Sequence, residues 1–221
     1  MFDFIKAGGW LMVPILACSL AAATLIIERL LALRRARVLP EQLVAILRRW
    51  VDLGAVHPAD MDALPLGSPL GRIVAAGLAH RHRNRELLRE RVEDVGRHVV
   101  HELERFLNTL GSIAAISPLL GLLGTVTGMI KVFEVVAAQG NSNFSLLSIG
   151  IAEALVTTAA GLTVAIPSLL FYRHFQRRID ELVVDMEQET LELIDLLDAE
   201  STAPPAPESV VAATPAQDSL S

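Results

Sequence analysis

Three long apolar runs divide the sequence, and they constrain its fold more than any other feature. They cover residues 10–27, 106–130 and 146–172, and Glu153 is the one residue in them from the Asp, Glu, Lys and Arg group. A transmembrane helix needs about 20 predominantly apolar residues to cross ~30 Å of hydrocarbon. Because only helices and closed barrels satisfy their backbone polar groups in lipid, the sequence predicts an all-α integral membrane protein with three transmembrane helices.

The first run has a rival interpretation as a cleaved signal peptide. Residues 1–9, "MFDFIKAGG", carry one Lys and one Asp, whereas a secretory signal begins with a basic segment. The run is followed by "ERLLALRRAR", which is typical of the flank of a retained span. The sequence therefore favours a retained membrane anchor.

The distribution of Lys and Arg predicts the orientation of the spans. Arginines cluster after the first run, at 29, 34, 35 and 37, and after the third run, at 173, 177 and 178. Residues 1–9 offer only Lys6, and the connection at 131–145 offers only Lys131. Because basic residues stay on the cytoplasmic side, residues 28–105 and 173–200 are predicted to be cytoplasmic. Residues 1–9 and the hairpin 131–145 are predicted to lie outside.

The cytoplasmic parts are predicted to be helical extensions of the spans. In residues 85–106 the apolar positions recur every three to five residues, as along one face of a helix. No proline separates this segment from the second span, so the two are expected to form one long rod. The third span is likewise expected to continue as a cytoplasmic helix over 173–200. Residues 201–221 are rich in Pro, Ala and Ser, which predicts a disordered tail.

Several functional classes find no support in the sequence. Cys18 is the single cysteine, which excludes an intrachain disulfide and a cysteine metal cluster. His98 and His101 have helical spacing, but they lack further placed ligands and are interpreted as helix surface. No phosphate-binding loop and no hydrolase motif is present. Basic residues are dispersed and lack base-stacking aromatics. The sequence therefore predicts no enzyme activity, no cofactor, no metal and no nucleic-acid partner.

The second and third spans contain small and polar residues that a plain lipid anchor does not need. One face of the second span is small and weakly polar and consists of Pro118, Gly121, Thr125, Gly128 and Val132. Gly124 and Gly128 add a G-x-x-x-G beside it, and such small faces favour close helix packing. On the third span, Glu153, Thr157 and Gly161 share one stripe with Ser168. Turning Glu153 toward lipid would cost about 2.5–3.5 kcal/mol, so it is expected to face protein or water. Its role stays open between a structural anchor and part of a hydrated ion route.

An ion route would need more than this chain offers in one copy. The other two spans contain no Asp, Lys, Arg or His, so either several copies enclose a common lumen or a partner supplies the missing acid. Hydroxyl groups both donate and accept hydrogen bonds and can hold a file of water. Thr125 and Thr158 are the predicted lining pair, and Thr157 is the alternative if the third helix is rotated.

Two segments resemble the signature helices of the ExbB/TolQ/MotA proton-channel family. They are "SPLLGLLGTVTGMIKVF" and "GIAEALVTTAAGLTVAIPSLLFYRHF", in the family's order and spacing. The three spans, the external N-terminus and the large cytoplasmic region resemble the ExbB and TolQ branch. The chain departs from many ExbB and TolQ members at Thr127, where they carry a bulky aromatic, and in its hydroxyl-rich "TTAAGL". These departures leave the subtype open, and they leave room for sodium in place of protons.

The resemblance implies a pentameric ring in the bacterial inner membrane, so that residues 1–9 and 131–145 would be periplasmic. It also implies a lumen that holds the single spans of an ExbD- or TolR-like pair, whose aspartate titrates, and a TonB- or TolA-like protein that carries the work to the outer membrane. The family's polar positions fall on Thr125, Glu153 and Thr158. Its prolines fall on Pro118 and Pro167, and with Gly121, Gly124, Gly128 and Gly161 they are expected at helix or subunit contacts. The function expected is an ExbB-like stator and channel subunit; the alternatives are a TolQ-like subunit for envelope maintenance and a non-conducting scaffold.

Overall fold

The computed structural model describes residues 8–57, 60, 64–81, 83–139 and 144–202, and this part of the chain contains helices and no strands. The prediction of an all-α protein is thus confirmed. The helices are α2 (Met12–Ala32), α3 (Arg35–Val38), α4 (Glu41–Leu53), α6 (Pro69–Ala79), α7 (Arg85–Leu103), α8 (Leu107–Gln139) and α9 (Phe144–Thr202).

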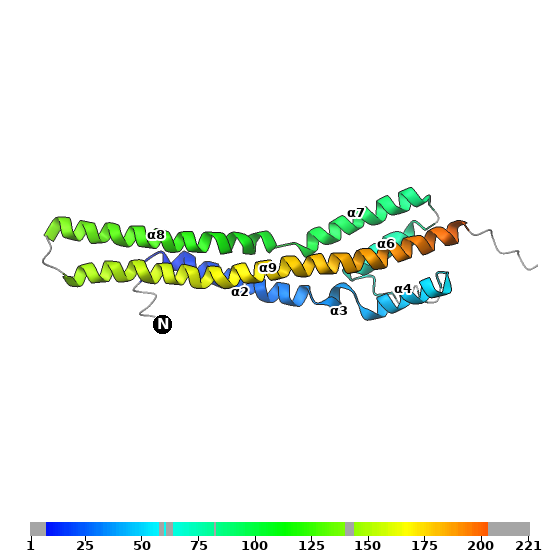
Figure 1. The fold of residues 1–221 in the computed structure, drawn as a ribbon, viewed down its shortest axis with the longest axis horizontal. Helices are drawn as coiled ribbons and strands as arrows, with labels where there is room; N and C mark the ends of the chain where they lie inside the picture. The colour runs from blue at the N-terminus through cyan, green and yellow to red at the C-terminus, as the bar shows by residue number, and fades with distance from the viewer. Residues whose placement is uncertain (1–7, 58–59, 61–63, 82, 140–143, 203–221) are drawn as a thin grey trace, which may run out of the picture.

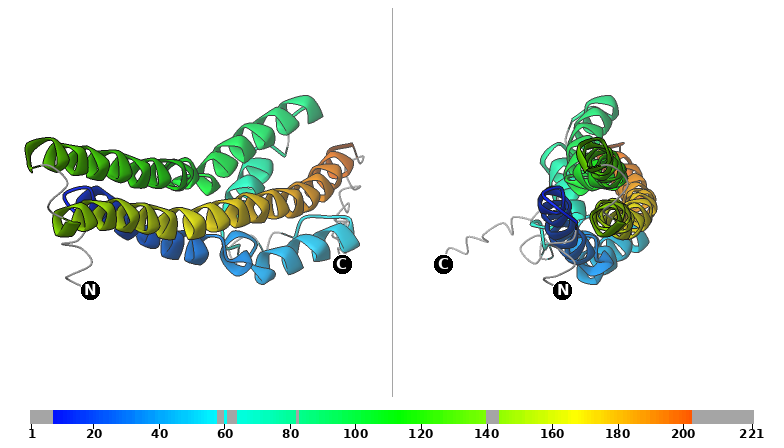
Figure 2. Two further views of the ribbon diagram at one scale, coloured as in Figure 1. Left: turned by 60° about the vertical axis from the view of Figure 1, so that its left-hand side comes forward. Right: turned by 90° about the vertical axis from the view of Figure 1, so that its left-hand side faces the viewer.

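The longest helix, α9, forms the axis of the molecule. It has 59 residues, which corresponds to roughly 90 Å at about 1.5 Å per residue. α8 runs antiparallel beside its first half, and α2 lies against both of them (Figures 1 and 2). α4, α6 and α7 pack around its second half. The third predicted span continues without a break in α9 as far as Thr202, and the point at which this helix leaves the membrane stays a prediction.

The half built from α2, α8 and the start of α9 has the surface of a membrane protein. Each of these helices is long and apolar enough to cross a bilayer. Large apolar side chains point outward from all three, among them Leu16, Leu20, Leu119, Leu122, Leu155, Ile166 and Leu170. A soluble monomer rarely exposes an apolar patch of this extent, whereas a lipid-facing helix requires one. The first predicted span begins two residues before α2, the second begins one residue before α8, and the third lies wholly within α9. The membrane boundaries themselves stay predictions.

The other half is an ordinary hydrophobic core with recognisable helix ends. The Ser68 side chain accepts a hydrogen bond from the Gly71 backbone N–H (3.0 Å) and caps α6, and Pro69 occupies the first helical position. Gly54 ends α4 with φ 67°, a left-handed conformation that glycine adopts without a steric penalty. Trp50 is fully buried, and its indole N–H donates to Asp60 (3.2 Å).

The expectation of one rod from α7 into α8 is wrong. α7 ends at Leu103 and α8 begins at Leu107, and Phe106 between them has φ 65°. Arg29, at the end of α2, is 5% exposed and donates to the Leu103 carbonyl (2.9 Å). Its guanidinium also lies 5.5 Å from the centre of the Phe106 ring. An arginine distant in sequence thus satisfies a carbonyl that the break leaves open.

Some expectations concern residues outside the described part. Residues 1–7 of the predicted external N-terminus, 140–143 of the predicted hairpin, and 203–221 of the predicted tail belong to this group. On either side of the connection the helices extend into the predicted hairpin, because α8 continues to Gln139 and α9 starts at Phe144.

Candidate functional site

Small residues allow α8 and α9 to approach closely along the membrane half. A Cβ atom on Gly161 would lie 2.5 Å from the Ser117 carbonyl oxygen, and one on Gly121 would lie 3.1 Å from that of Thr157. A Cβ atom on Gly128 would lie 2.9 Å from the Gly150 carbonyl oxygen. Glycines at these positions therefore set the distance between the helices. Because the close contacts lie within one copy, a role of the same glycines between subunits stays a prediction.

The two predicted prolines lie differently from the glycines. Pro118 is half-buried in α8 and Pro167 is exposed on α9. Proline inside a helix removes a backbone hydrogen bond, and in lipid, neighbouring groups or local adjustments satisfy the freed carbonyl.

Gly124 packs directly against the Thr157 side chain. The small face predicted on α8 thus includes residues that contact α9.

The three predicted lining threonines occupy different environments. Thr157 is completely buried, and its hydroxyl lies 3.0 Å and 2.9 Å from the Glu153 and Ala154 carbonyl oxygens of its own helix. The half-buried Thr158 donates across to the Gly121 carbonyl on α8 (3.0 Å). Thr125, also half-buried, donates to Leu122 within α8 (2.7 Å). Each hydroxyl therefore donates its hydrogen to a backbone carbonyl, and its oxygen can still accept a hydrogen bond.

Glu153 forms an ion pair across the two helices. Its Oε1 lies 2.5 Å from Nζ of Lys131 on α8, and the Glu153 side chain is 14% exposed whereas that of Lys131 is 50% exposed. The Gly9 backbone, with φ 67°, lies so close that a Cβ there would overlap the Glu153 carboxylate. The carboxylate is thus enclosed by α8, α9 and the chain just before α2.

Lys131 and Gly9 are the residues that sequence reasoning did not assign to this site. The signal for Lys131 was available, because Lys131 and Glu153 lie at similar distances along the chain from the α8–α9 connection. In an antiparallel helical hairpin such positions come to the same level. For Gly9 no local pattern indicates a contact with α9, since the contact depends on where α2 begins to pack.

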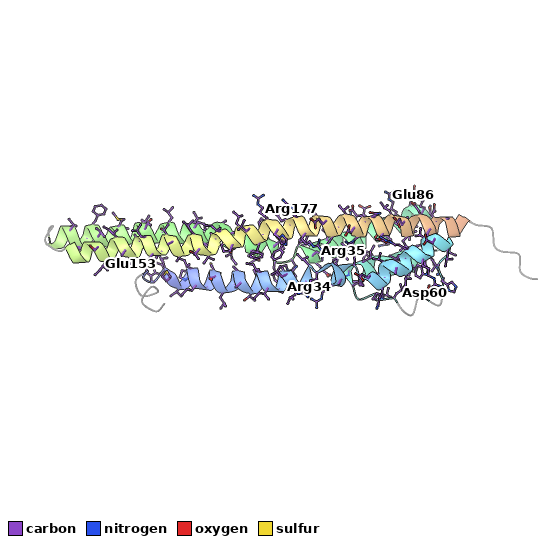
Figure 3. All side chains as sticks on the ribbon, turned by 60° about the horizontal axis from the view of Figure 1, so that its bottom comes forward. Arg34, Arg35, Asp60, Glu86, Glu153 and Arg177 are labelled. Atoms are coloured by element: carbon purple, nitrogen blue, oxygen red, sulfur yellow. The ribbon has the colours of Figure 1, made fainter. Side chains whose placement is uncertain are left out.

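Glu153 lies far along the molecule from the arginines that Figure 3 labels. It lies in the membrane half, while Arg34, Arg35 and Arg177 lie near the middle of the molecule. Between Glu153 and these arginines, residues 12–27, 107–130 and 154–172 contain no Asp, Glu, Lys, Arg or His. One copy of the chain therefore offers hydroxyl groups along this stretch and no titratable relay.

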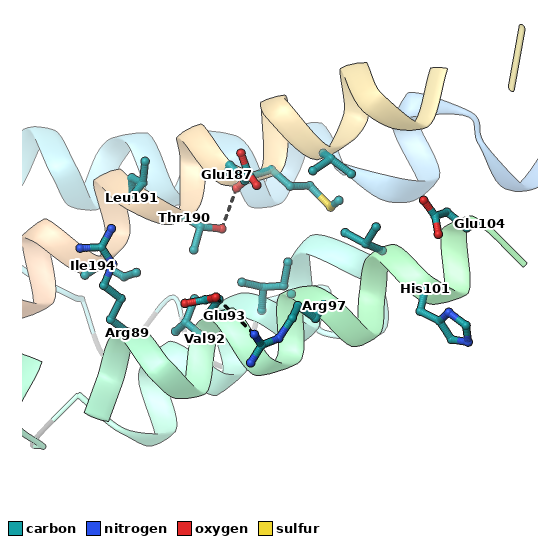
Figure 4. Close-up of a pocket in the computed structure, with 15 residues that line it drawn as sticks. Arg89, Val92, Glu93, Arg97, His101, Glu104, Glu187, Thr190, Leu191 and Ile194 are labelled. Carbon is teal, nitrogen blue, oxygen red and sulfur yellow. Dashed lines mark hydrogen bonds and ion pairs between the residues drawn. The ribbon is translucent and has the colours of Figure 1, made fainter. Parts of the chain in front are cut away.

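A separate groove lies between α7 and α9 in the polar half (Figure 4). It encloses about 670 Å³, with an apolar floor that includes Val92 and Ile194 and with Arg89, Glu93 and Arg97 among its charged lining residues. Glu93 pairs with Arg97 on the same helix (3.4 Å). Thr190, another lining residue, donates its hydroxyl hydrogen to the Met186 carbonyl of its own helix (2.6 Å).

Comparison with known proteins agrees with this geometry. A model of the MotA/TolQ/ExbB proton channel family matches residues 66–188, more than half of the chain. The putative biopolymer transport protein ExbB-like 1 of Synechocystis is 34% identical over 174 residues, which are 77% of this chain and 68% of that protein. ExbB of Salmonella typhimurium is 42% identical over 92 residues, 42% of this chain and 36% of that protein.

A third relative is named TolQ, whereas the other two are named ExbB or ExbB-like. The Tol-Pal system protein TolQ of Haemophilus influenzae is 34% identical over 86 residues, 39% of this chain and 38% of that protein. The match to the family model includes α8 and the membrane part of α9, where the small-residue contact, the hydroxyls and Glu153 lie. The chain therefore belongs to the ExbB/TolQ branch of the MotA/TolQ/ExbB proton channel family, whose members are membrane transport subunits and not enzymes.

Proposed function

We propose that the chain is the stator and channel subunit of a proton-driven motor in the bacterial inner membrane. In this proposal several copies, expected to be five, form a ring around the single spans of an ExbD-like partner pair. Proton flow through the complex drives movement that a TonB-like protein transmits to transporters in the outer membrane. The N-terminus is periplasmic and the C-terminus cytoplasmic, as the arginines after α2 and near residue 177 favour.

One observation carries the proposal. The membrane half presents a polar surface that is incomplete as a proton route: the half-buried Thr125 and Thr158 provide hydroxyls, and residues 12–27, 107–130 and 154–172 contain no Asp, Glu, Lys, Arg or His. A proton route through lipid needs groups that accept and release protons. A partner that supplies a carboxylate within the ring would complete the route, and the chain would supply the polar wall around it.

The energy available is sufficient for a mechanical step. One elementary charge crossing the membrane releases about 2.3 kcal/mol per 100 mV, several times thermal energy. Small, mostly apolar walls of a lumen would let an inner helix pair turn without deep interlocking. Gly121 and Gly124 do not form such a wall, because both are buried against α9 within one copy.

A TolQ-like role is the second candidate. The similarity to TolQ of Haemophilus influenzae supports it, because it covers a share of this chain close to that covered by ExbB of Salmonella typhimurium. Under this alternative the partner is TolR-like, the coupled protein is TolA-like, and the output is envelope maintenance. Complementation of strains that lack either system distinguishes the two roles.

The test is proton flux into vesicles that contain this chain together with its single-span partner. Replacing Thr125 and Thr158 by valine keeps their shape and removes both hydroxyls. Flux is expected to fall about tenfold, the effect of roughly one lost hydrogen bond at the barrier. Replacing the same two residues by serine keeps the hydroxyls and is the matched control, which should retain most of the flux.

The outcome also separates a channel from a scaffold. A non-conducting scaffold predicts that activity is lost only when assembly is lost. The channel predicts a valine variant that assembles fully and conducts about tenfold less than wild type. Flux and outer-membrane uptake that remain intact in the assembled valine variant would reject the lining assignment of Thr125 and Thr158.

A further inference from the structure

We propose that Lys131 is the permanent counter-ion of Glu153, and that the pair fixes the outer end of α8 against α9 without itself relaying protons. This inference rests on the proposed channel function, since it assigns Glu153 a positioning role within that channel. It starts from the ion pair between Lys131 Nζ on α8 and Glu153 Oε1 on α9, two residues that are 22 positions apart in the chain.

The enclosure of the carboxylate supports a fixed anion. Glu153 is 14% exposed, and the Gly9 backbone leaves no space for even a Cβ beside its Oε1. Lys131 is 50% exposed, so the ammonium group faces the outside and the carboxylate faces inward. A charged group that is removed from solvent is retained only with a partner, and Lys131 provides that partner from within the same copy.

A proton carrier has to change its charge in every cycle. Neutralising Glu153 would leave the Lys131 charge without its counter-charge at the edge of the apolar region, which is unfavourable. Protonation of an acid on a partner would leave the pair between Lys131 and Glu153 intact, so it would not incur this cost. The geometry therefore places the proton-carrying acid elsewhere and leaves Glu153 to hold α9 in register with α8, including the buried Thr157 one turn further along.

The contacts around the ion pair explain why it is needed to hold α8 and α9 in register. Gly128 and Val132 of α8 lie against Gly150 and Ala154 of α9, with a Cβ on Gly150 placed only 2.5 Å from the Val132 side chain. Contacts between such small residues give little resistance to sliding, because they present few protruding side chains. An ion pair at the same level would resist a shift of one helix past the other.

The experiment removes the two charges separately and together in the complete complex with its partner. Glu153→Gln and Lys131→Met are each expected to lower proton flux about tenfold, because each leaves one charge unpaired. The double variant is expected to regain flux to within about threefold of wild type, since no unpaired charge remains. Lys131→Arg should conduct like wild type, and Glu134→Gln, at an exposed acid on α8, is the matched control for loss of a carboxylate.

The pH profile of flux separates positioning from proton carriage. If the titrating acid lies on the partner, the double variant keeps the wild-type pH profile. A double variant that assembles and stays as inactive as Glu153→Gln would overturn the inference, because the carboxylate itself would then be required. If the double variant does not assemble, the exchange Lys131→Glu with Glu153→Lys decides: conduction supports the pair, and loss of either assembly or conduction overturns it.

Failure of the proposed channel would look different. It would appear as absence of flux in the wild-type complex itself. In that case the pair is still testable through thermal stability of the purified chain. The two single substitutions should lower the melting temperature more than the double does, and equal or additive losses would show that Lys131 and Glu153 are not paired.

Discussion

The membrane half and the polar half of this protein are held together in opposite ways. In the polar half, large side chains such as Trp50, Leu70 and Phe175 are almost completely buried, and stability comes from removing apolar area from water. In the membrane half many large side chains point outward, and α8 meets α9 largely through glycine, alanine and hydroxyl groups. Lipid offers no hydrophobic gain for helix association, so close contact replaces it.

This difference predicts that the two halves fail through opposite changes. The polar half should be sensitive to the removal of atoms, which leaves cavities. The membrane half should be sensitive to the addition of atoms, which separates helices. The ion pairs on the surface of the polar half should matter least, because exposed pairs contribute little to stability.

The largest effect is expected from Trp50→Ala. Trp50 is 0% exposed and its N–H bonds to Asp60, so truncation removes buried area, leaves a cavity and leaves Asp60 without this donor. The expected loss is about 3–5 kcal/mol, measured by thermal unfolding of the complex in detergent. The membrane half should stay folded, and protection of α8 and of the first half of α9 from hydrogen exchange checks this. Equal loss of protection in both halves would contradict their independence.

A smaller but specific effect is expected from Gly161→Ala. The added methyl would meet the Ser117 carbonyl oxygen at 2.5 Å, and that backbone atom cannot rotate away. Overpacking of this kind costs about 1–3 kcal/mol and should lower the temperature at which the complex dissociates.

The matched control for Gly161→Ala is Gly96→Ala in α7. A Cβ at Gly96 meets nothing within 4 Å, so this substitution should stabilise the helix by up to about 1 kcal/mol. The same chemical change is thus expected to have opposite signs in the two halves. Destabilisation by both substitutions would weaken the contrast between them.

Much of the fold could be predicted from hydrophobicity alone. Apolar runs long enough to cross lipid determine helices whatever they contact, and for this reason the three spans and the continuation of α9 were predictable. The break between α7 and α8 was not. It depends on Arg29, which reaches the Leu103 carbonyl from the end of α2, and no local pattern near Phe106 signals it. The absence of proline permits a continuous helix but does not require one.

The candidate site was predictable in composition and less so in its contacts. The cost of a carboxylate in lipid indicated that Glu153 would find protein or water, and the stripe through Thr157 follows from helical periodicity. The pairing with Lys131 required the register between α8 and α9. Contacts between small residues, such as Gly128 with Gly150, do not indicate that register in advance, because many pairings of small residues would fit equally well.

The smallest effect is expected at the ion pair between Arg72 on α6 and Glu102 on α7. The guanidinium donates two hydrogen bonds to the carboxylate, of 2.9 Å and 2.7 Å, but both side chains are largely exposed. Glu102→Gln should therefore cost no more than about 1 kcal/mol near neutral pH, and less in high salt. Thermal unfolding of wild type and variant measures this difference.

The pH dependence of stability shows whether this small contribution comes from the charge of Glu102. The hydrogen bond from Arg72 lowers the pKa of Glu102, and charge interactions with Arg72, His98 and Arg105 act in the same direction. The stabilisation should be fully present above the ordinary carboxyl pKa of 4.5 and should disappear as the pH falls through the lowered pKa of the folded state. Wild type and Glu102→Gln should then converge in stability at low pH. A difference in stability that persisted in acid would show that Glu102 stabilises the α6–α7 contact through packing of its side chain. This contact in the polar half would then depend on close packing, as the contact between α8 and α9 does in the membrane half.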